Sequence, residues 1–202
     1  MIKTILKLIA LIVLILFFIT GLSWIKTSEE AKNFVISKRI YHNFGQFWED
    51  AGFVMKNRKK IGPTMKGGVI SPAFRERLML IVTSVNNCSS CSNLHTKQAL
   101  IAGLSIEETG MLLKGILDHS PDKEIPALVY AKRWANADAK SMAKAEQKII
   151  KTYGKEVNEA IELVLRMIRL GNLLSNTKDY LLCRFSFGSW NPAETEVCIL
   201  PL

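Results

Sequence analysis

The clearest helix signals of this chain lie in residues 71–100, SPAFRERLMLIVTSVNNCSSCSNLHTKQAL. Ser71 is a good helix N-cap, and Pro72 suits the first helical position after it. From Leu78 to Val85, apolar residues recur at spacings of three and four, as on a helix with one buried face. The sequence therefore predicts a helix that begins at Pro72 and packs against a core.

A second helix follows almost at once, because the two asparagines before Cys88 interrupt the first. We expect Asn87 to cap this second helix, which runs from about Cys88 to Leu100 and stops at Gly103. A connection this short allows the two helices to pack antiparallel.

The rest of the chain also predicts helices. Three further helix starts carry a capping box or a proline: Thr27 with Glu30, Ser105 with Glu108, and Pro126. The first of these precedes an expected helix over residues 31–44, and residues 157–168 form a long amphipathic pattern. No alternating, β-branched run with hairpin turns appears. We expect an all-α fold.

Length and composition fit one helical domain. The chain has 202 residues, 49% hydrophobic and 22% charged, which is enough for one ordinary core. We assign residues 27–182 to this domain and residues 183–202 to an irregular tail. Four cysteines are too few for a scaffold built from disulfides, so each must be explained separately.

Residues 1–26 do not belong to that core. The segment Leu8–Ile25 contains no charge and just reaches the length of a transmembrane helix. Lys3 and Lys7 precede it, and the short N-terminal tail favours an N-terminus in the cytoplasm. We expect a single-pass anchor with the domain outside the cytoplasm, which in a bacterium is an oxidising compartment. A cleaved signal peptide and a buried helix are the alternatives.

The chain has a net charge of +9, and its one dense cluster of basic residues is the run KNRKK at residues 56–60. Such a run is usually a solvated face, and no recognition-helix signature accompanies it. We therefore expect no nucleic-acid partner and place this charge near anionic lipid headgroups.

The two cysteines and the histidine after them form one stripe on the second helix. Cys88, Cys91 and His95 are spaced by three and four residues. In the first turn of a helix, free backbone amides stabilise a thiolate, and His95 is placed to take the thiol proton. If the helices pack antiparallel, Glu76 on the first helix reaches His95 and orients it.

The spacing of Glu76, Cys88, Cys91 and His95 resembles the E-x11-C-x2-C-x3-H signature of the alkyl hydroperoxidase D-like branch of the carboxymuconolactone decarboxylase family. The resemblance is nearly continuous over residues 71–108 and weaker over the rest of residues 40–182. Ser89 and Ser90 stand where the best-known peroxidase members carry a histidine.

The resemblance implies an all-α bundle that commonly forms homo-oligomers, trimers among them. It implies thiol-dependent reduction of hydroperoxides or of disulfide partners, without metal or haem, and an unidentified thiol electron donor. It also implies roles: Cys91 is the attacking thiol, Cys88 is the resolving thiol, and His95 with Glu76 is the proton relay.

Several alternatives remain for the same residues. Structural zinc would need a fourth ligand, for which Cys183, Cys198, His42 and His119 show no paired spacing. Ser92 in place of a histidine excludes a C-x-x-C-H haem attachment, and a thioredoxin fold would need strands. A membrane-tethered interaction module without catalysis, or a carboxymuconolactone decarboxylase-like enzyme, stays open as the alternative function. Cys183 and Cys198 either pair in the tail or remain free thiols.

Overall fold

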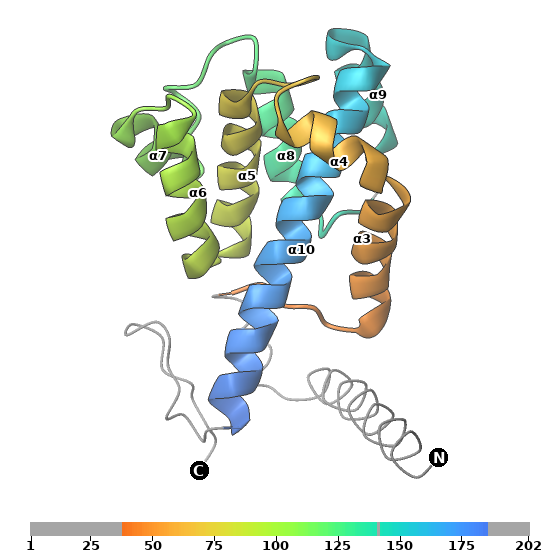
Figure 1. Cartoon of the computed structure of the whole chain (residues 1–202), viewed down its shortest axis with the longest axis vertical. Coiled ribbons are helices and arrows are strands. Elements are labelled where there is room, and N and C mark those ends of the chain that lie inside the picture. The colour runs from red at the N-terminus through yellow and green to blue at the C-terminus, as the bar shows by residue number, and fades with distance from the viewer. Residues whose placement is uncertain (1–37, 141, 186–202) are drawn as a thin grey trace.

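The computed structural model describes residues 38–140 and 142–185, and the regular secondary structure in this part of the chain is all helix, without a strand (Figure 1). The helices are α3 (Phe44–Lys56), α4 (Arg58–Met65), α5 (Pro72–Asn86), α6 (Ser89–Ile101), α7 (Ile106–Leu113), α8 (Ile125–Asn136), α9 (Ala143–Tyr153) and α10 (Lys155–Phe185). The predicted fold class is confirmed over these residues.

Helix α5 forms the centre of the bundle. It packs against α6, α7, α8 and α10, and it is buried along most of its length. The neighbouring helices cover several faces of α5 and not only the one that the apolar pattern indicated. Four of its residues are completely enclosed: Leu78, Leu80, Ile81 and Val82. This all-round burial explains why even the charged residues near its start are inaccessible to solvent.

One of those charged residues ties three helices together. Arg77 of α5 donates from Nε to Glu108 of α7 at 2.6 Å and from Nη1 to Glu124, just before α8, at 3.0 Å. Burial by itself lowers the pKa of Arg77, but the hydrogen bonds and the charges of both carboxylates outweigh it and raise that pKa. Ser105 caps α7 as predicted, but the carboxylate of Glu108 binds Arg77 and so does not complete a capping box.

A second, smaller core lies between α3 and the later turns of α10. Ile40 and Tyr41 pack there against Leu173 and Tyr180. Behind it, Asp50 of α3 is fully buried and pairs with two arginines of α10, Arg166 and Arg169. These contacts attach α3 to the long C-terminal helix.

The expected helix over residues 31–44 is wrong in its described part. Residues 38–43 form an extended strap, and α3 begins only at Phe44, where Asn43 caps it by accepting the amide of Gln46 at 3.0 Å. Burial of Ile40 and Tyr41 in the second core, together with this cap, holds the strap outside a helix. Residues 31–37 and the expected cap at Thr27 lie outside the described residues.

The other helix starts fit the sequence more closely. Ser71 accepts the amide of Phe74 at 3.1 Å ahead of α5, and Pro126 stands in the first turn of α8. Helix α10 runs to Phe185, three residues into the stretch expected to be irregular; the remainder of that stretch lies outside the described residues.

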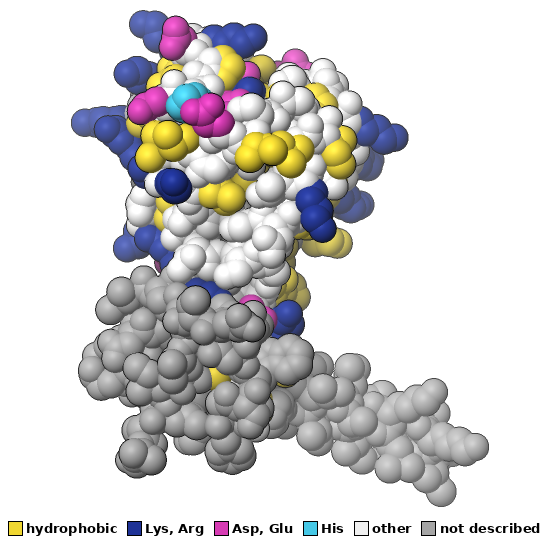
Figure 2. Space-filling view, turned by 90° about the vertical axis from the view of Figure 1, so that its left-hand side faces the viewer, with side chains coloured by type: hydrophobic (Ala, Val, Ile, Leu, Met, Phe, Trp, Pro, Cys, Tyr) yellow, Lys and Arg dark blue, Asp and Glu magenta, His cyan; other side chains and the backbone are white. Residues whose placement is uncertain are grey.

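The described helices include none that is long and apolar enough to cross a membrane. The predicted anchor, Leu8–Ile25, lies outside the described residues. On the face lined by α6 and α7, some hydrophobic side chains remain at the surface (Figure 2), among them Leu94, Ile101 and Ile106. The basic run at residues 56–60 falls at the junction of α3 and α4, where Lys60 pairs with Glu159 of α10 at 2.6 Å.

Candidate functional site

The turn between α5 and α6 positions the first cysteine. Asn87 adopts the left-handed conformation, with φ 52° and ψ 51°, and ends α5. Asparagine tolerates this conformation better than most residues, which lets the chain reverse within so short a connection. Our prediction that Asn87 caps α6 was therefore wrong. Cys88 is the N-cap, and its Sγ accepts the amide of Cys91 at 3.3 Å.

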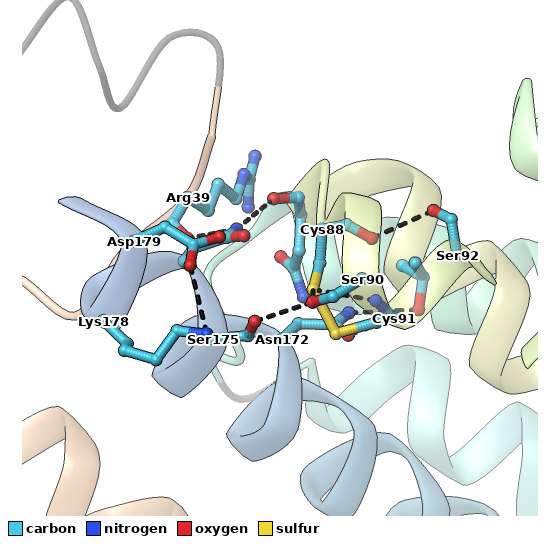
Figure 3. Close-up of a disulfide and its surroundings, with 12 residues drawn as sticks. Arg39, Cys88, Ser90, Cys91, Ser92, Asn172, Ser175, Lys178 and Asp179 are labelled. Atoms are coloured by element: carbon cyan, nitrogen blue, oxygen red, sulfur yellow. Dashed lines mark hydrogen bonds and ion pairs between the residues drawn. A yellow bond between two sulfur atoms is a disulfide. The ribbon is translucent and has the colours of Figure 1, made fainter. Parts of the chain in front are cut away.

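Cys88 and Cys91 form a disulfide, with their Cα atoms 5.3 Å apart. Figure 3 shows the pair at the start of α6, beside the later part of α10. The two sulfurs differ in access: Cys88 is only 1% exposed, whereas Cys91 is partly exposed. A reagent that attacks this disulfide from solvent therefore reaches Cys91 first.

The carboxylate and the histidine meet as the sequence predicts. Nδ1 of His95 lies 2.8 Å from Oε2 of Glu76, across the contact between α6 and α5. A carboxylate only accepts hydrogen bonds, so Nδ1 carries a proton, and in the neutral imidazole the lone pair then lies on Nε2. Since Cys91 and His95 are four residues apart on one helix, Nε2 belongs to the helix face that carries the more exposed sulfur.

Arg75 is a member of this cluster that sequence reasoning missed. Its Nε and Nη2 lie 2.9 and 2.8 Å from Oε1 of Glu76, and its Nη1 donates to the carbonyl of Met65. Glu76 is 1% exposed, so Arg75 supplies the positive charge that a buried carboxylate requires. The only signal in the sequence was a basic residue on each side of Glu76, and neighbours in a helix usually face different directions.

The arrangement brings four side chains together at the start of α6. It contains a partly exposed cysteine, a buried cysteine in disulfide linkage with it, and an imidazole whose orientation is fixed by a buried carboxylate. Two cavities of the bundle lie elsewhere, and one of them, about 540 Å³, is lined by Phe74 and Tyr153 near the start of α5.

The other two described histidines contact none of these four residues in the recorded hydrogen bonds and ion pairs. His119 pairs loosely with Glu107, at 3.8 Å, and His42 follows the N-terminal strap's buried Tyr41. Cys183 is buried and disulfide-bonded, while Cys198 lies outside the described residues. Within residues 38–140 and 142–185, no three His, Cys, Asp or Glu side chains are grouped to hold a metal ion.

Comparison with known proteins gives a family match over the middle of the chain. Residues 57–137 match the carboxymuconolactone decarboxylase family. The matched segment runs from α4 to the end of α8 and includes Glu76, both cysteines of the disulfide and His95. No curated protein and no solved structure matches the chain.

Proposed function

We propose, with the carboxymuconolactone decarboxylase family match as the premise, that this protein is an alkyl hydroperoxidase D-like thiol oxidoreductase. In this proposal Cys88 and Cys91 cycle between a dithiol and a disulfide. The observation that carries it is the disulfide at the start of α6, one turn before a histidine that a buried carboxylate orients at 2.8 Å. A disulfide that only stabilised the fold would close too short a loop to contribute much, and it would need no base beside it.

The reduced pair begins the reaction. Nε2 of His95 takes the proton of the Cys91 thiol, and the resulting imidazolium, held by Glu76, stabilises the thiolate. The thiolate attacks one oxygen of a hydroperoxide ROOH and becomes a sulfenic acid, while the departing alkoxide takes the proton from His95 and leaves as ROH. Cys91 is assigned to the attack because it is the more exposed of the two sulfurs.

The buried cysteine then resolves the intermediate. The Cys88 sulfur attacks the sulfenic acid on Cys91, a disulfide forms, and water leaves. With a disulfide substrate, the same thiolate of Cys91 attacks one sulfur, the first substrate thiol leaves with the proton from His95, and Cys88 then displaces the second substrate thiol from the mixed disulfide. Both routes end in the pair that the structure contains.

Membrane attachment and assembly complete the proposal. The uncharged segment Leu8–Ile25 anchors the protein, with the domain outside the cytoplasm. The exposed Ile101 and Ile106, 78% and 79% accessible, offer an apolar surface for homo-oligomer contacts, of which a trimer is one form.

The test separates the two cysteines in the reduced, full-length protein. Cys91→Ser should abolish consumption of an organic hydroperoxide, whereas Cys88→Ser should retain one turnover per chain and then stall at the sulfenic acid. Stopped-flow measurement of the first turnover, with trapping of the sulfenic acid by dimedone, distinguishes them. Equal loss in both variants contradicts the assignment of roles. No hydroperoxide or disulfide turnover in the wild type would favour the interaction module or a decarboxylase.

A further inference from the structure

The buried sulfur of the pair has two hydrogen-bond donors beside it. The amide of Cys91 donates to Cys88 Sγ at 3.3 Å, and the hydroxyl oxygen of Ser90 lies 3.5 Å from the same sulfur. A disulfide sulfur is a weak acceptor, whereas a thiolate is a charged one, so both contacts strengthen when Cys88 is released from the disulfide.

Ser90 is also held from the opposite side. Its Oγ lies 2.7 Å from Oγ of Ser175 on α10, a contact drawn in Figure 3. A thiolate only accepts hydrogen bonds, so in the reduced state Ser90 donates its proton to the sulfur of Cys88. The oxygen of Ser90 then accepts from Ser175, which gives a chain from Ser175 through Ser90 to Cys88.

These donors act on the leaving group of disulfide reduction. A thiol from solvent reaches Cys91, the partly exposed sulfur, and Cys88 departs with the electron pair. Burial of Cys88 opposes a negative charge there. The positive end of the α6 dipole favours that charge, and so do the amide of Cys91 and the hydroxyl of Ser90. Each hydrogen bond that gains a charged acceptor shifts the equilibrium from disulfide toward dithiol by about tenfold.

We propose that the Cys88–Cys91 pair is poised as an oxidant that passes its disulfide to substrate thiols. The inference rests on the proposed function, from which it takes Cys91 as the attacked sulfur. Two thiols, 2 RSH, reduce the enzyme disulfide to the dithiol and leave as RSSR. A hydroperoxide then oxidises the dithiol back to the disulfide and leaves as ROH and water. Electrons thus pass from substrate thiols to peroxide, and Ser90 sets how readily the first half proceeds.

The test measures the redox equilibrium without any turnover. The full-length protein is equilibrated anaerobically with about 10 mM glutathione and about 1 mM glutathione disulfide, a poise near that of an oxidising compartment. The sample is then quenched in acid and alkylated. Trypsin releases residues 78–97, which contain Cys88 and Cys91 but neither of the other cysteines. Mass spectrometry of this peptide gives the reduced fraction.

We expect more than half of the wild-type pair to be reduced under these conditions. Ser90→Ala should shift the equilibrium toward the disulfide by about three- to tenfold, less than a buried bond would give, because Ser90 is exposed. Ser175→Ala should shift it in the same direction by less. Ser92→Ala is the matched control: its hydroxyl donates to the carbonyl of Cys88 at 3.0 Å and not to the sulfur, so the equilibrium should not move.

A wild-type pair that stays mainly oxidised at this poise overturns the proposal, and so does a Ser90→Ala equilibrium equal to that of Ser92→Ala. A different result would contradict the proposed function: the pair reaches the expected equilibrium with glutathione, but the protein consumes no hydroperoxide.

Discussion

Replacing Glu76 by glutamine tests the relay through two separate measurements. The carboxylate is 1% exposed, accepts from Arg75 at 2.8 and 2.9 Å, and holds His95 at 2.8 Å. Glutamine keeps the size and one oxygen of the side chain but removes the charge. The change therefore leaves the packing of α5 intact and acts on the two partners.

The stability effect follows from the burial of Arg75. Arg75 is 8% exposed and, in the variant, loses its carboxylate partner and keeps only neutral acceptors, the amide oxygen of the glutamine and the carbonyl of Met65. Removing one member of a buried ion pair typically costs about 3–5 kcal/mol. Because small domains unfold with about 5–15 kcal/mol, the variant should fold at 25 °C but melt about 10 °C below the wild type.

The chemical effect falls on Cys91. Without the carboxylate, the His95 imidazolium loses its stabilising partner, and the pKa of the reduced Cys91 thiol should rise. We expect the rate of alkylation by iodoacetamide at about pH 7 to fall by about tenfold, since a change of 1.4 kcal/mol corresponds to that factor in thiolate population. Fragment spectra of the peptide over residues 78–97 assign the label to Cys91.

Glu108→Gln is the matched control. Glu108 is also a buried carboxylate bound to an arginine of α5, but its partner Arg77 keeps Glu124 at 3.0 Å. This variant should lose less stability, about 1–3 kcal/mol, and alkylate at the wild-type rate. A Glu76→Gln profile against pH that coincides with the wild type would refute the relay. Equal loss of reactivity in both variants would trace the effect to stability and not to His95.

Three further predictions use other parts of the chain. His95→Ala should lower Cys91 alkylation more than Glu76→Gln does, because the cation itself is gone, and an unchanged profile against pH would make His95 a packing residue only. Burial and the charge of Glu146 raise the pKa of Glu162, so its ionised form destabilises the fold. Glu162→Gln should therefore raise the melting temperature by about 2 °C at about pH 7, and calorimetry should find this gain lost below the ordinary value of 4.5. A membrane-impermeant thiol reagent, applied after mild reduction, should label the domain in intact cells or spheroplasts; labelling only after lysis would place it in the cytoplasm, and a shortened soluble protein would identify a cleaved signal.

Much of the fold and the centre of the site could be predicted because the deciding signals are local. Ser71 and Pro72 mark the start of α5, and a short connection forces α6 back along it. That reversal brings Glu76 and His95 together, as their spacing predicts. The error at Asn87 was also local: the chain needs a left-handed residue to end α5, Asn87 takes that place, and the N-cap of α6 therefore falls on Cys88.

What the sequence did not indicate depends on contacts between distant residues. Ser90 and Ser175 are 85 positions apart, and no pattern in the sequence around Ser90 predicts its hydrogen bond to α10. Ile40 and Tyr41 lie in an apparently helical pattern, but the second core holds them extended. Asp50 similarly acquires its role only when α10 brings two arginines to it. Such tertiary contacts override local preference.

The strap, residues 38–43, is hydrogen-bonded to the end of α5, just before Cys88. The amide of Arg39 donates to the carbonyl of Asn86 at 3.1 Å, and Asn176 donates to the carbonyls of both residues at 2.8 Å. Asn86 stands two positions before Cys88. With the proposed anchor in a bilayer, residues 26–37 span at most about 40 Å even at full extension. With any partner that is itself bound to the membrane, the site would then react through lateral diffusion, so that turnover with such a partner should scale with its surface density and not with its bulk concentration.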